Sequence, residues 1–209
     1  MTIDRAAAPF VALALVPSGV ALWMGSSVSA VALLALPVAI ALFFRDPHRT
    51  SDSDPSLVLA PADGTVMHAG PARPDEAPPG SWQQVTIFLS VLDVHINRTP
   101  AAGRVTRVDY VPGTFLPAYR AEAHANEHSE IWLDHSGTPL VVRQVVGVLA
   151  RRVVCRVQAG ETLTPGQKIG LMKFGSRMDV FVPTTARLAV TRGQTVRAGQ
   201  TVIAHLVTR

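Results

Sequence analysis

The segment Val157-Gln-Ala-Gly-Glu-Thr-Leu-Thr-Pro-Gly-Gln-Lys-Ile169 recurs 33 residues later as Val190-Thr-Arg-Gly-Gln-Thr-Val-Arg-Ala-Gly-Gln-Thr-Val202. Two glycines in each copy are separated by a short extended piece, which predicts a strand, a glycine turn, a second turn and another strand. The identical pairs are Val157/Val190, Gly160/Gly193, Thr162/Thr195, Gly166/Gly199 and Gln167/Gln200. The repeat therefore predicts a mainly β domain, a compact sandwich similar to a barrel-sandwich hybrid.

The sequence around this repeat is also typical of strands. Short apolar runs are separated by Gly, Pro and Asp, and no window has a long helical period. The best candidate for a short helix lies at Pro117–His128, and the prolines of Pro71–Gly80 predict a loose hairpin tip. The predicted strands are Leu57–Ala60, Val85–Leu92, Val105–Val111, Leu140–Leu149, Val153–Val157, Lys168–Phe174, Met178–Val182 and Arg187–Thr191.

The N-terminal region has a different composition. No charged residue occurs from Pro9 to Phe44, and Gly25-Ser26-Ser27 divides the apolar region into Ala6–Met24 and Val28–Phe44. Each part is about 25–28 Å long as a helix, so a closely packed two-helix membrane hairpin fits better than one tilted span preceded by an interfacial segment. We expect kinks at the prolines within the two helices, Pro17 and Pro37.

These features predict a membrane anchor at 1–44, a polar linker at 45–56 and a catalytic domain at 57–209. Arg45, His48 and Arg49 follow the apolar region, and this basic edge favours the cytoplasmic face of a cell membrane. The formal net charge is +4, but the arginines are scattered and form no stripe suited to nucleic acid. The single cysteine, Cys155, cannot form an internal disulfide and is expected in the core.

The Gly175-Ser176 bond lies between the two copies of the repeat. A Gly-Ser pair is often an ordinary turn. It is also a bond that a chain can cut by itself, because attack of the serine hydroxyl on the glycine carbonyl converts the amide to an ester. Elimination and hydrolysis then leave a pyruvoyl group, a built-in electrophile, on a new N-terminus.

Three separate stretches resemble one family, the phosphatidylserine decarboxylase proenzymes of the short membrane-anchored type. They are Ala60-Pro-Ala-Asp63-Gly-Thr-Val66, Asp93-Val-His95-Ile-Asn-Arg98-Thr-Pro100 and Phe174-Gly-Ser176-Arg-Met-Asp-Val180. Their order after an apolar N-terminus makes the resemblance specific, and it covers nearly the whole chain.

The resemblance implies that Gly175–Ser176 is cut, giving a β chain of residues 1–175 and an α chain of residues 176–209 that stay together as a heterodimer. It implies a covalent pyruvoyl cofactor made from Ser176, which forms a Schiff base with phosphatidylserine in the bilayer and releases CO2 to give phosphatidylethanolamine. No metal, diffusible cofactor or nucleic acid is expected. His95 is the candidate base and proton donor, and Asp63 is the candidate group that orients it.

One position departs from the longer members of the family, which carry H-x-x-H-x-P where this chain has His95 followed by Arg98. Arg98 and Phe174 are therefore candidates for substrate binding, Arg98 through the substrate carboxylate or phosphate. Arg177 and Asp179 share one face of a strand and are expected to form an exposed pair.

The sequence patterns also leave two other functions open. His124-Ala-Asn-Glu-His128 fits H-x-x-E-H, an inverted zinc-peptidase signature that needs both histidines on one helix and a third ligand such as Glu130 or His135. The glycine turns of the repeat also occur in biotinyl and lipoyl carrier domains, in which case Lys173 would be the modified lysine of a membrane-tethered carrier or adaptor.

Overall fold

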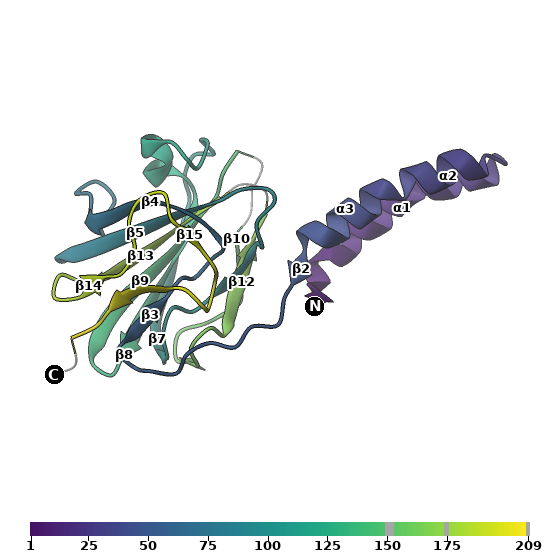
Figure 1. Ribbon diagram of the computed structural model, residues 1–209. Helices are drawn as coiled ribbons and strands as arrows, with labels where there is room; N and C mark the ends of the chain where they lie inside the picture. Colours follow the sequence, from purple (N-terminus) through teal and green to yellow (C-terminus); the bar gives the residue numbers. More distant parts are fainter. Residues whose placement is uncertain (149–152, 174–175, 208–209) are drawn as a thin grey trace. The chain divides into compact units, whose positions relative to one another are not determined.

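The structure, a computed structural model, describes residues 1–148, 153–173 and 176–207. The chain divides into two compact units, Met1–His48 and Arg49–Arg209 (Figure 1). The first unit is mainly helical and the second is built almost wholly of strands.

The N-terminal unit is a pair of antiparallel helical segments (Figure 1). Gly25 has a φ of +82°, a left-handed conformation that glycine adopts readily, and it lies in the turn between the segments. The second segment is interrupted after Leu33, because Pro37 has no N–H to donate to the carbonyl of Leu33. The elements are β1 (Thr2–Ile3), η1 (Arg5–Ala7), α1 (Ala8–Trp23), α2 (Ser27–Leu33), α3 (Ala35–Phe43) and β2 (Arg45–Asp46), with β1 and β2 paired antiparallel.

The helical stretch Arg5–Trp23 is long and apolar enough to cross a bilayer, and Ser27–Phe43 is a shorter apolar helical stretch. Most of their large side chains are exposed in the chain itself, including Trp23 and Val28. An uncharged surface of this kind is suited to lipid.

The β unit contains one curled sheet of eight strands and two sheets of three strands among the described residues (Figure 1). The large sheet has the order β11-β7-β8-β9-β13-β5-β4-β15, and the small sheets have the orders β10-β12-β6 and β14-β16-β3. The strands are β3 (Leu57–Leu59), β4 (Gly64–Pro71), β5 (Trp82–Leu89), β6 (Ile96–Arg98), β7 (Gly103–Val111), β8 (His128–His135), β9 (Thr138–Val145), β10 (Val153–Cys155), β11 (Thr162–Leu163), β12 (Lys168–Met172), β13 (Ser176–Pro183), β14 (Arg187–Leu188), β15 (Thr195–Val196) and β16 (Val202–His205).

These strands form two similar halves related by an approximate two-fold axis between β9 and β13. The quartet β11-β7-β8-β9 corresponds to β15-β4-β5-β13, and each small sheet corresponds to the other. The β7–β8 and β4–β5 ladders contain a bulge at the same place, after Val105 and after Val66 respectively. The internal repeat of the sequence supplies one segment of each half.

The repeat segments dock in the same way in both halves. Gly160 and Gly193 have φ values of +96° and +93° and donate their N–H groups to Val105 O and Val66 O, respectively. Their partners belong to a second, shorter repeat, Thr99-Pro-Ala-Ala-Gly-Arg-Val105 and Ala60-Pro-Ala-Asp-Gly-Thr-Val66. This shorter repeat was missed in the sequence, since only the ladder register brings its two copies into equivalent places.

One hydrophobic core lies between the large sheet and the two small ones, with side chains from all three. Alternation along β13 directs Met178 and Val180 into this core. We call this side of the large sheet the inner face and the opposite side, which carries Arg177 and Asp179, the outer face. The fold is thus mainly β with an apolar helical N-terminus, as the sequence predicted.

Several local predictions were wrong. Only Ala121–Ala125 is helical within Pro117–His128, as the short 3-10 helix η2. The Pro71–Gly80 tip is not loose, because Glu76 is buried against the outer face. Strands β4 and β8 were not predicted as strands, and the predicted strand Leu140–Leu149 ends at Val145. The prediction for Cys155 holds in part, since this free cysteine is half-buried and packs against the core.

Candidate active site

Ser176 is the first residue of β13, a central strand that pairs with β5 on one side and with β9 on the other. Its side chain points to the inner face, in alternation with Arg177, and is completely buried. Among the described residues its Oγ has no hydrogen-bond partner. A buried hydroxyl without a partner is costly, so its presence indicates a function rather than a contribution to stability.

Two backbone contacts place the segment that carries His95 near the start of β13 and the end of β12. Leu89 pairs with Ser176, and six residues later the carbonyl of His95 accepts a hydrogen bond of 3.2 Å from the N–H of Met172. The turn after β5 lies between Leu89 and His95. The turn is closed by Asp93, whose carboxylate accepts the N–H of Ser90 at 2.8 Å.

The hydrogen bonding of His95 fixes which ring nitrogen carries the proton. Nδ1 lies 2.9 Å from the carbonyl oxygen of Asp93, which can only accept, so Nδ1 carries the hydrogen. Nε2 is then the basic nitrogen of the neutral ring. The side chain is buried, as expected of a base that works away from water.

Asn97 and Gln144 form a buried amide pair beside these two residues. Asn97 is in β6, two positions after His95, and its Oδ1 accepts a hydrogen bond of 2.7 Å from Gln144 Nε2. Gln144 pairs with Met178, so it is a diagonal neighbour of Ser176 on the inner face, at a separation of about 7–8 Å.

The amide pair has one donor and one acceptor to spare. Asn97 Nδ2 and Gln144 Oε1 have no hydrogen-bond partner within the described ranges, although both residues are fully buried. Exchanging the O and N assignments of both amides would still leave one NH2 group and one carbonyl unused. Gly170 permits the close approach of β12, because a Cβ there would lie 2.9 Å from Gln144 Nε2. Sequence reasoning missed both amides, although Asn97 lies within the His95 motif.

Asp63 lies where the second copy of the repeat docks. Its Oδ1 accepts the N–H of Ala198 at 2.8 Å, and its carboxylate forms a salt bridge with Arg49 that includes a hydrogen bond of 2.7 Å to Oδ2. Within the described part of the chain, Asp63 has no hydrogen bond to His95. Arg49, one of the basic residues predicted to face lipid headgroups, is thus engaged within the β unit.

Arg98 points away from the amide pair, since it alternates with Asn97 along β6. Its guanidinium donates to Gly166 O at 2.9 Å, and its Cδ lies 3.1 Å from the position of a Cβ on Gly199. Arg98 therefore contacts the second glycine turn of each repeat. Phe174 and Gly175 lie outside the described residues.

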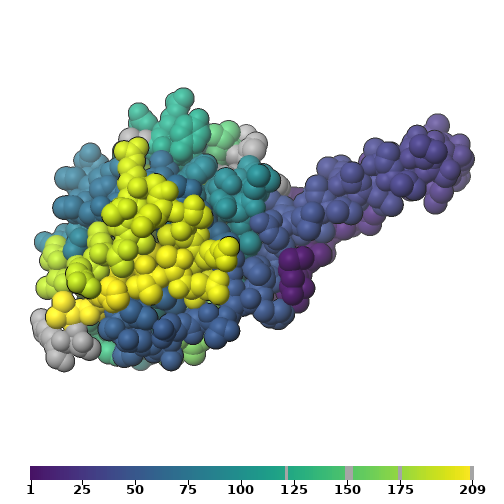
Figure 2. All heavy atoms as spheres, in the orientation of Figure 1, coloured from purple at the N-terminus to yellow at the C-terminus, as the bar shows by residue number. Residues whose placement is uncertain are grey.

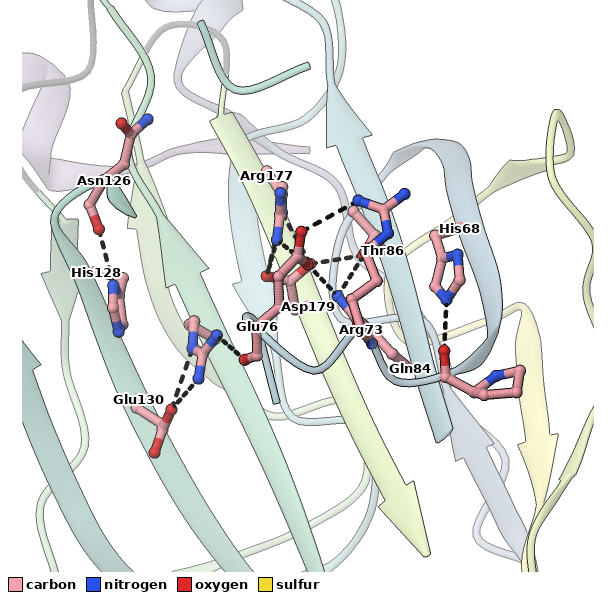
Figure 3. A network of polar contacts seen from close by, with 12 residues as sticks. His68, Arg73, Glu76, Gln84, Thr86, Asn126, His128, Glu130, Arg177 and Asp179 are labelled. Atoms are coloured by element: carbon pink, nitrogen blue, oxygen red, sulfur yellow. Dashed lines mark hydrogen bonds and ion pairs between the residues drawn. The ribbon is translucent and has the colours of Figure 1, made fainter. Parts of the chain in front are cut away.

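The outer face behind Ser176 carries a network of buried ion pairs (Figure 3). Arg177 donates to both oxygens of Asp179 at 2.9–3.1 Å and to Glu76 Oε2 at 2.6 Å. Thr86 donates to Asp179 Oδ1 at 2.7 Å, and Gln84 donates to Glu76 Oε2 at 2.6 Å. The polar groups of this cluster therefore bond to one another.

The network continues across β9 to β8. Arg143 donates to Glu130 Oε2 at 2.6 Å and to the backbone carbonyl of Glu76 at 2.6 Å (Figure 3). Trp132 Nε1 donates to Glu130 Oε1 at 2.7 Å. The segment that carries Glu76 is thus fixed to the sheet by both its side chain and its backbone.

Charge pairing shifts the pKa values of the two central groups. Burial alone would raise the pKa of Asp179, but the charge of Arg177 and its hydrogen bonds outweigh burial and hold that pKa below its ordinary value. Burial would likewise lower the pKa of Arg177, and Asp179 and Glu76 instead hold it above its ordinary value. The expectation of an exposed Arg177–Asp179 pair was therefore wrong: the two do share a face, but Glu76 covers it.

The structure gives no support to the zinc site. The helix ends at Ala125, whereas His128 begins β8 and its Nδ1–H donates to Asn126 O at 2.8 Å. Burial lowers the pKa of His128. No group of three metal-ligating side chains occurs among the described residues. Lys173, the lysine of the carrier alternative, is half-buried beside β12, whereas a carrier lysine is exposed at a hairpin tip.

The fold and these side chains together define a class of protein: a β-sandwich enzyme domain whose candidate nucleophile begins a central strand. The family model for phosphatidylserine decarboxylase matches residues 38–204. A phosphatidylserine decarboxylase proenzyme of Chlorobium chlorochromatii is 44% identical over 163 residues, covering 77% of this chain and 76% of that protein.

Two relatives with the same description match over more of the chain. The Salinibacter ruber protein is 39% identical and covers 91% of this chain and 88% of its own length. The Syntrophotalea carbinolica protein is 39% identical, with coverage of 95% and 94%, respectively. The chain belongs to the phosphatidylserine decarboxylase family.

Proposed function

We propose that the buried side chains around Ser176 carry out the decarboxylation of phosphatidylserine, the reaction of the family to which the chain belongs. The observation that supports this most directly is the Ser176 hydroxyl, which is buried at the head of β13 with no hydrogen-bond partner among the described residues. The chain would act as a proenzyme that cuts itself before Ser176 and converts this residue to a pyruvoyl group.

The site fits such a group. The serine hydroxyl is held by a central strand and is not committed to another side chain in the described ranges, so it is available to the adjacent Gly175 carbonyl. When formed, the pyruvoyl carbonyl supplies an electrophile for the substrate amine and takes up the electrons that remain when CO2 leaves.

His95 would act as the base that removes the proton from Ser176 Oγ. An unassisted serine hydroxyl is a weak nucleophile at neutral pH, and the neutral His95 ring has its basic nitrogen at Nε2. After cleavage the same ring, now protonated, would return a proton to the substrate carbon from which CO2 has departed. Asp63 would support this chemistry only indirectly, through the position of Arg49 and the repeat.

Asn97 and Gln144 would bind the serine headgroup. The spare amide NH2 suits a carboxylate and the spare carbonyl suits an ammonium group, and the headgroup carries both. Burial strengthens these hydrogen bonds, because no water competes for them. Arg98 remains a candidate for the substrate phosphate.

The proposal includes a membrane location and a two-chain product. The Arg5–Trp23 helix would hold the enzyme in a cell membrane, with the β unit on the cytoplasmic side. The cut would leave chains 1–175 and 176–209, which would stay associated because β13 is paired on both sides with strands of the longer chain.

Two measurements on one preparation test the proposal. The intact mass, before and after borohydride treatment, is expected to show a fragment ending at Gly175 and a 34-residue fragment that begins with a reducible carbonyl. Release of CO2 from phosphatidylserine should accompany these fragments. A single uncut chain that still releases CO2 would disprove the pyruvoyl mechanism, and a cut chain without CO2 release would disprove the substrate.

A further inference from the structure

Exposed apolar side chains are distributed unevenly over the β unit. Within the described residues of the β unit, eight large apolar side chains are exposed: Val91, Leu92, Tyr110, Val111, Phe115, Tyr119, Val148 and Val207. Scattered exposed apolar residues need no explanation, whereas a cluster of them marks an interaction surface.

The strand register places seven of these eight at one end of the large sheet, the end where Ser176 begins β13. Ser176 pairs with Leu89, Arg177 with Val145, and Val145 in turn with His128. His128 pairs with Val111, so these residues form a row across the sheet. Only Val207 lies at the opposite end, next to Trp82 and Pro183.

Three connections extend beyond this row and carry the apolar side chains. Val91 and Leu92, which is 84% exposed, lie in the connection between β5 and β6, directly before His95. Phe115 and Tyr119 lie in the connection between β7 and β8, which projects from the surface in teal near η2 (Figures 1 and 2). Val148 follows β9.

An aromatic contact ties the β7–β8 connection to β5 at this end of the sheet. The ring of Tyr119 meets that of Phe88 edge-on, with centroids 6.1 Å apart. Phe88 is on β5 opposite Arg177, so the β7–β8 connection reaches back across the strand ends to β5. We call these seven side chains the apolar rim.

We propose that the apolar rim docks on the surface of a lipid bilayer and places the Ser176 site at the headgroup level. This inference rests on the proposed function, because a diacyl substrate whose tails stay in lipid needs the site to meet the membrane. It also has independent support, since the chain carries an apolar helix long enough to hold the β unit at a bilayer.

The composition of the rim suits a membrane interface. Tyrosine is enriched at the headgroup level, where its ring lies in an apolar layer and its hydroxyl in a wet one, and Tyr110 and Tyr119 are both more than half exposed. Leu92 and Phe115 provide apolar surface that reaches the acyl boundary. The rim therefore commits the domain to one orientation, with the β5–β6 connection, the β7–β8 connection and Val148 toward lipid.

A direct test measures contact between the rim and lipid in the full-length protein reconstituted into phosphatidylcholine nanodiscs. Leu92→Cys, made in a Cys155→Ala background and labelled with a small fluorophore, should be quenched by brominated acyl chains. The same label at Val207→Cys is the matched control and should not be quenched. Absence of quenching at residue 92 would overturn the inference, including the case in which the rim instead contacts a second copy of the chain.

A second test separates docking from chemistry. The double variant Leu92→Ser/Phe115→Ser should lower turnover of phosphatidylserine in nanodiscs about tenfold, because it removes apolar area from the interface. Turnover of a short-chain phosphatidylserine dissolved below its micelle concentration should be unchanged, and Val207→Ser should change neither rate. An equal loss on both substrates would overturn the inference. If the wild-type protein turned over neither substrate, the proposed function would fail, and the quenching measurement would still test docking.

Discussion

The inner and outer faces of β13 use polar residues in opposite ways. On the inner face Ser176 and the nearby Asn97–Gln144 pair are buried with hydrogen-bonding groups to spare. On the outer face Arg177 and Asp179 are buried with their charges paired and hydrogen-bonded. Because the faces alternate residue by residue, one short strand holds both a site with unused hydrogen-bonding capacity and a network that fixes its position.

This difference between the two faces separates residues suited to the reaction from residues that fix the conformation of the strand. A buried polar group without a partner costs free energy, so it is retained where a substrate or a reaction step uses it. A fully paired buried network instead fixes one conformation. Substitutions on the inner face should therefore change rates and affinities, whereas substitutions on the outer face should change stability.

The largest effect is expected from Ser176→Ala. Without the hydroxyl there is no nucleophile for the Gly175 carbonyl and no source of the pyruvoyl group, so the protein should remain one chain of 209 residues with no decarboxylation. Electrophoresis and CO2 release measure both effects. Ser81→Ala, an exposed serine at the other end of the sheet, should be cut and active. A two-chain product from Ser176→Ala would show that another residue cuts the chain.

His95→Gln should slow both self-cleavage and decarboxylation by roughly 10²–10⁴-fold, the usual contribution of a general base or acid. The half-time of chain cleavage after synthesis reports the first step, and single-turnover CO2 release from the cut enzyme reports the second. His68→Gln is the control, because the hydrogen bond of His68 within the described residues is to the carbonyl of Pro71. Wild-type rates in both assays would remove His95 from the mechanism.

Glu76→Gln tests the outer face. Loss of this charge leaves Arg177 paired with Asp179 alone in a buried site, which should lower the free energy of unfolding by about 3 kcal/mol and the Tm by roughly 6–12 °C. Cleavage of the chain below the Tm should persist. Asp75→Asn removes an equal charge from the exposed neighbouring position and should leave the Tm unchanged. An uncut but stable Glu76→Gln protein would break the division between the two faces.

Gln144→Met should raise the KM for phosphatidylserine about 10–100-fold, the cost of losing a hydrogen bond to a charged group, with less effect on chain cleavage. Initial rates over a range of substrate concentrations separate KM from kcat. Gln83→Met, at the far end of β5, serves as the comparison. A pure loss of stability in Gln144→Met, with KM unchanged, would assign the amide pair to the core rather than to the headgroup.

The smallest effect concerns pH and the outer-face residue His128. Burial lowers its pKa in the folded state, so the unfolded chain binds a proton at a higher pH than the folded chain does. Stability should therefore fall as the pH drops through the unfolded value of about 6.5. Urea midpoints at pH 7.5 and pH 5.5 measure this loss, which should be smaller in His128→Gln. An unchanged loss would assign the pH dependence to other groups.

The parts of the molecule that follow a local pattern could be predicted from the sequence. The glycine repeat indicated the β fold and placed Ser176 between two equivalent segments, because the turns depend on residues close in sequence. His95 was found through its motif, and its burial next to the end of β12 agrees with the role predicted for it, which remains to be tested.

The rest depends on contacts between distant residues. Asn97 and Gln144 are 47 positions apart and meet only through the register of β6, β12 and β9. The Glu76 segment looked like a loose tip because its prolines exclude strand pairing, while its real partner, Arg177, is 101 positions away. Asp63 was predicted to orient His95, whereas its ion-pair partner in the structure is Arg49, which the sequence assigned to a basic edge at the membrane.

The central place of β13 has a consequence for mobility. Chain ends usually fray, and the first residues of a new N-terminus exchange their amide hydrogens quickly. A cut before Ser176 would instead create an end that is paired with β5 from its first residue and with β9 from its second. The enzyme would thereby obtain a ketone that only a chain terminus can carry, held with the rigidity of a sheet interior, and the amides of residues 177–181 should exchange as slowly as those of β5.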